Sequence, residues 1–235
     1  MMNRKKHRPF VFINLAMSAD GKVSTVKRKQ VRISGDNDLD RVDSLRAGCD
    51  AIMVGIGTVL ADDPSLTVKS EKRRAERREA GKAANPMRVV VDSKARTSVD
   101  AEILNKGEGE HVIAVSERAI VEDVDRLGDK AEIWVCGIEE VDLKKLLYLL
   151  WQRGVNRLMV EGGATLNWSL LSQKLVDEIY IYVGNILLGG EDAPTPVGGS
   201  GFVRAIPKLE LFSTERLDQG VLLQWRLRNM NGDEI

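Results

Sequence analysis

Cysteine, histidine and aromatic residues are scarce in this chain. Its 235 residues include two cysteines, two histidines and 5% aromatic residues. Cys49 and Cys136 share no spacing motif, so the sequence favours buried free thiols in a reducing compartment over a disulfide or a metal site. His7 and His111 also lack partners at metal-ligand spacing. Because GxSxG and HExxH are both missing, we expect no metal centre, and the chemistry of a bound cofactor is favoured over a covalent triad.

The chain also lacks an excess of charge and any long hydrophobic run. Its 35 Lys and Arg residues balance 35 Asp and Glu residues. Proteins that bind nucleic acid or membrane surfaces usually need a basic excess. No apolar run approaches the roughly 20 residues of a membrane span. The run 10–17 follows a basic segment, 1–8, but soon meets Asp20 and Lys22, unlike a signal peptide. We therefore expect a cytoplasmic protein without nucleic-acid or membrane partners.

Apolar runs that alternate with helical patterns indicate the fold class. Leucines at four positions of 142–153 form one helical stripe, and Ser34 or Asp36 is the predicted cap of a helix over 36–46. Strand–helix alternation predicts an α/β fold with a mostly parallel sheet flanked by helices. The last two strands predict a closing antiparallel hairpin. The other predicted elements are strands 10–15, 51–54, 88–92, 111–115, 132–136, 157–160, 178–183, 209–216 and 221–228, and a helix over 165–175.

One segment departs from this alternation. Residues 69–82 (KSEKRRAERREAGK) are almost all charged. As a helix, this segment places Glu71 and Glu76 at helical spacing from arginines, which favours local ion pairs. We favour a solvated insertion between two core strands; the alternative is a basic patch for RNA or a phosphorylated ligand. With no linker evident, we expect a basic tail over 1–8 and a single domain over 9–235.

Two glycine-containing turns each follow a predicted strand. The first is VGIGTVLADDP over 54–64, in which Thr58 is a predicted cap of a short helix. The second is VEGGATL over 160–166. Glycines let a ligand approach the backbone amides of a helix N-terminus, an arrangement that suits pyrophosphate. Since neither turn matches GxGxxG or a P-loop, an ordinary tight turn and a site for a phosphate-bearing ligand, a dinucleotide included, both stay open.

Three charged residues lie near these turns. Glu161 follows a predicted strand at the end where α/β folds bind ligands, although a carboxylate there also suits the capping of a nearby amide. Arg46 lies near the end of a predicted helix, where it also complements the helix dipole. Asp62 belongs to a DDP sequence that is equally typical of a turn.

Seven short motifs follow one another along the chain. They are 14–22 (NLAMSADGK), 44–46 (SLR), 54–58 (VGIGT), 60–67 (LADDPSLT), 88–93 (RVVVDS), 160–165 (VEGGAT) and 175–178 (LVDE). In this order they resemble the pyrimidine reductases of riboflavin biosynthesis, over about residues 9–201. The resemblance implies a dihydrofolate-reductase-like fold. Because the H-x-E and P-C-x-x-C signatures of a zinc deaminase are missing, the chain resembles the stand-alone archaeal and fungal type, which reduces the pyrimidine before deamination.

The resemblance also implies a reaction and a set of site residues. The reaction is the NADPH-dependent reduction of 2,5-diamino-6-ribosylamino-4(3H)-pyrimidinone 5′-phosphate by a homodimer, with hydride transferred to C1′ of the ring-opened imine; NADH stays open as the reductant. Substrate contacts are implied at Arg46, Leu66, Lys69 and Glu161. Cofactor contacts are implied at Ala16, Thr58, Asp62, Ser93, Gly162, Gly163, Ala164, Thr165 and Leu166.

The residues of the acid–base step and of cofactor choice are hypotheses. Glu161 and Asp62 are the candidates for moving protons, because neither histidine falls in the motifs. Ser93, with Lys94 or Arg96, is the candidate for holding a 2′-phosphate. The alternative functions are reduction of the deaminated pyrimidine or of a pterin on the same fold. Nucleic-acid binding is disfavoured, because segment 69–82 has no aromatic residue for stacking.

Overall fold

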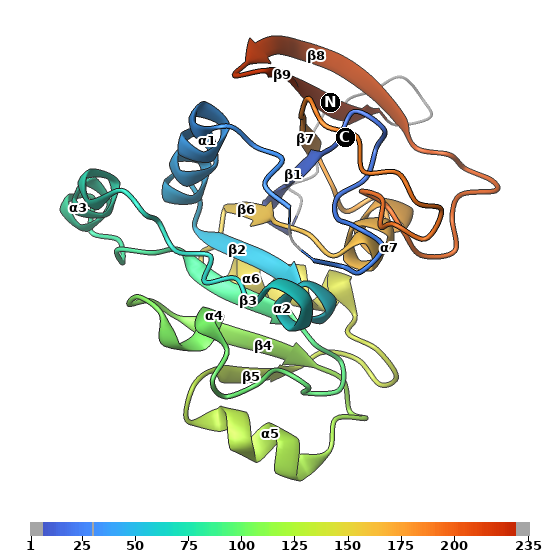
Figure 1. Cartoon of the computed structure of the whole chain (residues 1–235). Coiled ribbons are helices and arrows are strands. Elements are labelled where there is room, and N and C mark those ends of the chain that lie inside the picture. Colours follow the sequence, from blue (N-terminus) through green and yellow to red (C-terminus); the bar gives the residue numbers. More distant parts are fainter. Residues whose placement is uncertain (1–6, 30, 229–235) are drawn as a thin grey trace, which may run out of the picture.

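A nine-stranded sheet forms the centre of the protein in the computed structural model, which describes residues 7–29 and 31–228. The strand order is β5-β4-β3-β2-β6-β1-β7-β9-β8, with β5 and the β8–β9 hairpin at opposite ends (Figure 1). Pairs from β5 to β7 are parallel, and β9 pairs antiparallel with β7 and β8. The predicted fold class and closing hairpin are confirmed. The strands are β1 Phe10–Met17, β2 Ala51–Gly55, β3 Met87–Val91, β4 His111–Val115, β5 Glu132–Val135, β6 Arg157–Val160, β7 Glu178–Val183, β8 Lys208–Leu217 and β9 Gly220–Arg228.

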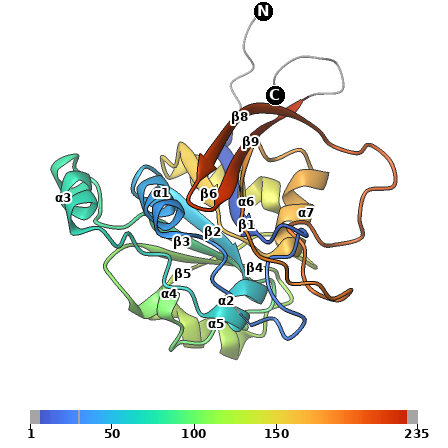
Figure 2. The same cartoon turned by 45° about the horizontal axis from the view of Figure 1, so that its top comes forward.

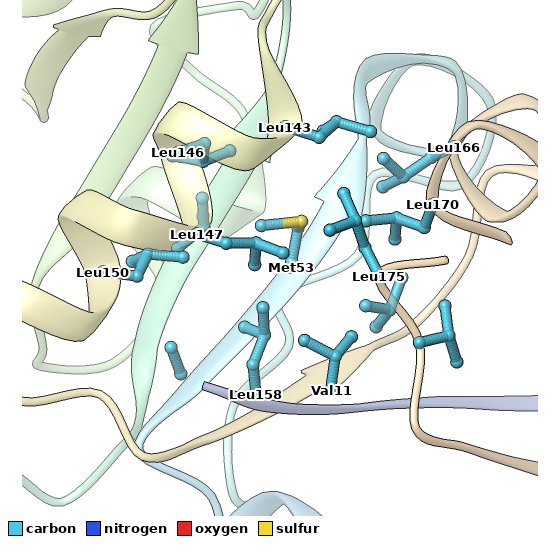
Figure 3. Packing of buried hydrophobic residues seen from close by; sticks show 14 of the residues in the cluster. Val11, Met53, Leu143, Leu146, Leu147, Leu150, Leu158, Leu166, Leu170 and Leu175 are labelled. Atoms are coloured by element: carbon cyan, nitrogen blue, oxygen red, sulfur yellow. The ribbon is translucent and has the colours of Figure 1, made fainter. Parts of the chain in front are cut away.

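Helices cover both faces of the sheet, and the core therefore has two layers. Along β2, Ala51 and Met53 belong to one hydrophobic cluster, whereas Ile52 and Val54 belong to the other. This alternation follows from the two-residue repeat of a strand. Figure 3 shows the first cluster, in which the leucines of α6 and α7 meet Met53. The helices are α1 Asp36–Ala47, α2 Ile56–Asp62, α3 Glu71–Glu79, α4 Glu102–Asn105, α5 Val121–Gly128, α6 Leu143–Gln152 and α7 Ala164–Ser172.

Helix α6 matches its prediction, but the cap of α1 does not. Asp142 caps α6 by accepting hydrogen bonds from the first-turn amides. The N-cap of α1 is Gly35, which has no capping side chain, and the Ser34 hydroxyl donates instead to the Asp38 carboxylate at 2.5 Å. The carboxylate of Asp218, from the β8–β9 turn, accepts the backbone N–H of Asp38 at 3.0 Å. The predicted cap by Ser34 or Asp36 is wrong because a residue distant in sequence takes that place.

The charged segment 69–82 forms α3, which lies outside the sheet beside α1 (Figures 1 and 2). Arg74 and Arg78 both pair with Glu71, and Lys72 lies 3.9 Å from Glu76. Arg77 is buried and donates only to backbone carbonyls. The charged side chains of the helix thus pair with its own carboxylates and with the body of the domain, in keeping with a solvated insertion.

The structure also bears on three further predictions, which concern the basic tail, the two cysteines and membrane spans. Residues 1–6 of the predicted tail lie outside the described residues, whereas Arg8 forms a two-point ion pair with Asp177 at 2.6 and 2.9 Å and so contacts the domain. Cys49 and Cys136 are buried and free, as predicted. Among the described helices, none has the length and apolar character needed to cross a bilayer.

Candidate active site

The two glycine turns lie against each other at the carboxyl ends of β2 and β6. The backbone N–H of Gly55 donates to the Gly162 carbonyl at 3.2 Å. A Cβ added to Gly163 would lie 3.5 Å from the Gly55 Cα, and one added to Gly162 would lie 3.7 Å from the Thr58 hydroxyl. The parallel pairing of β2 with β6 brings these distant segments together, since both strands end at the same edge. They therefore form one backbone-lined cradle.

The second turn leads directly into the N-terminus of α7. Gly162 and Gly163 have φ angles of +112° and +96°, which favour glycine. Gly163 is the N-cap and has no capping side chain. Within the part of the chain that the structure describes, the amides of residues 164–166 have no hydrogen-bond acceptor. Unpaired amides and the positive end of the helix dipole suit an anionic group here.

The first turn forms α2 differently from its prediction. Gly55 is the N-cap of this helix, and Thr58 lies inside it. The predicted capping role of Thr58 is wrong because the helix begins directly at the end of β2. Thr58 instead faces Gly162 across the cradle.

Arg46, near the end of α1, and Glu161, after β6, form a two-point ion pair. The guanidinium Nε and Nη2 each donate to one carboxylate oxygen at 2.6 Å. The two side chains are 16% and 11% exposed, so the pair is largely removed from solvent. Burial opposes the charged form of Arg46, but the attraction and hydrogen bonds of Glu161 outweigh it and raise the arginine pKa. Sequence reasoning chose both residues but did not predict that they bind each other.

Arg46 also fixes the segment 63–70, which carries two further predicted residues. Its Nη1 donates to the Thr67 carbonyl at 3.2 Å. Leu66 is buried with φ +49°, a left-handed conformation that costs a residue with a side chain about 1 kcal/mol or more. The exposed Lys69 donates from Nζ to the hydroxyls of Ser65 and Thr67, each at 2.9 Å. Burial, followed by repulsion from Arg46, lowers the pKa of Lys69.

Ala16 on β1, Asp62 on α2 and Ser93 after β3 belong to the same edge of the sheet, and no hydrogen bond or ion pair within the described residues joins them to Arg46 or Glu161. Ala16 lies near the end of β1, opposite Tyr182 of β7. Asp62 ends α2, and its carboxylate has no hydrogen bond or ion pair within residues 7–29 and 31–228; partial burial raises its pKa. The Ser93 hydroxyl, after β3, accepts the Val141 amide at 3.1 Å.

Three residues that hold backbone segments outside the assigned site residues were not identified from the sequence. Asp43 of α1 accepts hydrogen bonds from the amides of Lys69 and Ser70. Arg88 is fully buried, donates only to carbonyls that include that of Gly107 at 2.9 Å, and has its pKa lowered to about 10 by burial. Asp20 accepts the amides of residues 188 and 189. Only Asp20 and Arg88 fell in motifs, and spacing gave no sign of their partners.

Comparison with known proteins places the chain in a family. The model of the RibD C-terminal domain matches residues 9–223. A 2,5-diamino-6-ribosylamino-4(3H)-pyrimidinone 5′-phosphate reductase of Archaeoglobus fulgidus is 53% identical over 213 residues, covering 91% of this chain and 95% of that protein. A protein of the same name from Methanothermobacter thermautotrophicus is 45% identical, covering 94% and 99%. The chain thus spans nearly the whole length of both relatives.

Solved structures agree on the fold. A pyrimidine reductase-like protein of Corynebacterium diphtheriae superposes with a TM-score of 0.82 at 16% identity, covering 94% of this chain and 92% of that one. A dihydrofolate reductase of Enterococcus faecalis has a TM-score of 0.52 at 8% identity, covering 94% and 97%. The predicted dihydrofolate-reductase-like fold is confirmed.

Proposed function

The chain belongs to the RibD C-terminal domain family and is a pyrimidine reductase of riboflavin biosynthesis, and from this premise we propose that it reduces 2,5-diamino-6-ribosylamino-4(3H)-pyrimidinone 5′-phosphate with NADPH. One observation carries the proposal: a glycine-lined helix N-terminus adjoins a cationic cluster of Arg46 and Lys69 at one edge of the sheet. The first suits a dinucleotide pyrophosphate and the second a sugar phosphate. The names of the two archaeal relatives support the substrate.

The residues of the cradle fit a dinucleotide. Backbone amides at residues 164–166 would hold the pyrophosphate, and the missing side chains of Gly162 and Gly163 leave room for it. Four further residues would line the same edge: Thr58 and Asp62 on α2, Ala16 on β1, and Ser93 after β3. Lys94 and Arg96, both exposed next to Ser93, would neutralise a 2′-phosphate and so favour NADPH over NADH. When bound, the cofactor supplies a hydride, which we assign to C1′ of the ring-opened ribosylamine.

Arg46, Leu66, Lys69 and Glu161 would contact the substrate. Arg46 and Glu161 are already ordered by their ion pair, so little side-chain entropy is lost when the substrate binds. The left-handed backbone conformation at Leu66 turns the chain just before the segment that contains Lys69. Lys69 is exposed and, within the described residues, its ammonium is bonded only to neutral hydroxyls, and it would take the 5′-phosphate.

Of the two candidate proton carriers, the geometry favours Asp62. Both carboxylate oxygens of Glu161 accept hydrogen bonds from Arg46. Asp62 has no such partner among the described residues, and partial burial raises its pKa, which favours a carboxyl that can hold a proton. We assign Asp62 to the proton that the reduced nitrogen or ring oxygen requires, and Glu161 to orienting the substrate through Arg46.

We also propose a cytoplasmic homodimer. Leu209, Leu211 and Val221 are 39%, 44% and 39% exposed on the β8–β9 hairpin, and β8 is the edge strand of the sheet. An edge strand of this length presents backbone groups and exposed apolar side chains to which another chain can pair, here a second copy of the chain. The two free buried thiols suit a reducing compartment. Light scattering of the purified protein tests the dimer.

Three substrates test the function. We would follow oxidation of NADPH by absorbance with the diamino compound, with its deaminated counterpart and with dihydrofolate, and repeat the first with NADH. Turnover of the diamino compound is expected to be fastest. Faster turnover of either alternative would overturn the proposed substrate, and equal use of NADH would overturn the cofactor preference.

A further inference from the structure

Asp43, a carboxylate outside the assigned site, connects the two segments that carry the cationic residues Arg46 and Lys69. Asp43 is on α1, three residues before Arg46, and its side chain is only 9% exposed. Its Oδ1 accepts the backbone N–H of Lys69, and its Oδ2 accepts the backbone N–H of Ser70 at 3.1 Å. Asp43 therefore ties the segment that carries Lys69 to the helix that carries Arg46.

This connection matters because Asp43 is the α1 side chain that hydrogen-bonds the backbone of Lys69 and Ser70 directly, within the described residues. Arg46 reaches the segment only at the Thr67 carbonyl, two residues earlier. Ser70 is the N-cap of α3, so the Asp43 carboxylate also faces the positive end of that helix. Two amides, the Arg73 guanidinium and a helix dipole hold one buried carboxylate, and the Lys69 position is set against α1.

We propose that Asp43 is a positioning residue that fixes the Lys69 ammonium beside Arg46, so that Lys69 supplies the attraction and Arg46 the direction that together select a substrate bearing a terminal phosphate. This inference rests on the proposed function, in which Lys69 takes the phosphate. Asp43 itself touches neither the substrate nor the reacting atoms. Its loss lets the Lys69 backbone move away from α1 and separates the two charges.

The chain offers a matched control at Asp40, one turn earlier on α1. Arg73 pairs with both carboxylates, through Nη1 to Asp43 at 2.9 Å and through both terminal nitrogens to Asp40 at 2.7 Å. Asp40 is 69% exposed and makes no contact with the Lys69 backbone. Asp40→Asn therefore perturbs the same arginine without loosening the segment.

Steady-state kinetics of Asp43→Asn and Asp40→Asn test the proposal. We expect Asp43→Asn to raise KM for the phosphorylated substrate about ten-fold, the size of a lost hydrogen bond to a charged group. KM for the dephosphorylated substrate and the affinity for NADPH are expected to stay unchanged, and Asp40→Asn to stay within about two-fold of wild type throughout. In a Lys69→Ala background, Asp43→Asn should have no further effect on KM.

Equal losses with both substrates, or additive effects of Asp43→Asn and Lys69→Ala, would overturn the positioning role. If Asp43→Asn does not fold, Asp43→Ser takes its place, because it keeps one acceptor oxygen. Calorimetric binding of inorganic phosphate to wild type and to both variants gives a readout without turnover: weaker binding to Asp43→Asn alone is expected, and equal binding would overturn the inference. Failure of the proposed function is recognised separately, by wild-type protein that does not turn over the diamino compound.

Discussion

Glu161→Gln is the substitution whose consequences the geometry defines best. It keeps the shape of the side chain but replaces one acceptor oxygen with an amide that points N–H groups at the Arg46 guanidinium. Both carboxylate oxygens are used at 2.6 Å, and both side chains are mostly buried. Because Glu161 is the counter-charge that raises the pKa of Arg46 against the opposing effect of burial, the substitution leaves a buried guanidinium without its carboxylate.

Removing one partner of a buried ion pair typically costs 3–5 kcal/mol, and the residual exposure places this case near the lower limit, at about 3 kcal/mol. For a chain of this size, that loss lowers Tm by roughly 6–12 °C. Thermal and urea unfolding of wild type and Glu161→Gln measure both quantities. In kinetic assays, kcat/KM for the pyrimidine substrate is expected to fall much further than the affinity for NADPH, because the cradle at residues 162–166 is untouched.

A double substitution separates stability from function. Arg46→Met with Glu161→Leu replaces the pair by apolar groups. We expect this double variant to have a free energy of unfolding within about 1 kcal/mol of that of wild type, without restored turnover. If the free energy of unfolding of Glu161→Gln lies within about 0.5 kcal/mol of the wild-type value, the ion pair does not contribute the stability that its burial implies. An unchanged kcat/KM would remove Glu161 from the site.

Three further predictions concern residues outside the pair. Asp218→Ala removes the cap of α1 and is expected to cost about 1 kcal/mol, seen as a Tm lowered by about 2–4 °C, whereas Asp218→Asn keeps an acceptor and costs less. The hydrogen bond from the Ser18 hydroxyl, followed by those from two amides, lowers the Asp20 pKa from 3.8 to about 2. The resulting stability is present above pH 3.8 and is lost as the pH falls through 2, so the Tm difference between wild type and Asp20→Asn should be constant above pH 3.8 and shrink below it; a difference that grows in acid would contradict this. Burial raises the pKa of Cys49 to about 12 and also raises that of Cys136, so neither thiol should react with a thiol reagent at neutral pH until the protein unfolds; rapid labelling of the native protein would show that the burial is transient.

Local pattern was sufficient for most of the sheet. Strands β4, β6 and β7 have the predicted bounds, because a short apolar run between turn residues leaves little freedom in where the strand begins and ends. The four leucines of the predicted stripe on α6 are all buried, whereas the fifth leucine of the helix, Leu149, lies off the stripe and is only partly buried. The short helices α4 and α5 were not predicted, since a four-residue helix and a helix that begins with exposed Val121 give weak periodic signals.

The candidate site was predictable only in part, because its residues meet through tertiary contacts. Arg46 and Glu161 are separated by 115 positions, and no local rule joins them. Asp218 caps α1 from the far end of the chain, so a search for a cap near Asp36 cannot find it. The glycine turns were identified individually, but their contact follows from the position of β6 beside β2 in the strand order.

The ion pair between Arg46 and Glu161 also determines which cationic side chain is available to bind a phosphate. With Nε and Nη2 of Arg46 bonded to Glu161 and Nη1 bonded to the Thr67 carbonyl, the guanidinium is neutralised within the protein. Lys69 is bonded to two uncharged hydroxyls and has no carboxylate partner among the described residues. The segment that carries Lys69 is fixed by Asp43, and its backbone is twisted at Leu66. A phosphate that binds here gains its net attraction from Lys69, while Arg46 supplies direction, and selectivity for a phosphorylated substrate therefore depends on how this segment is held.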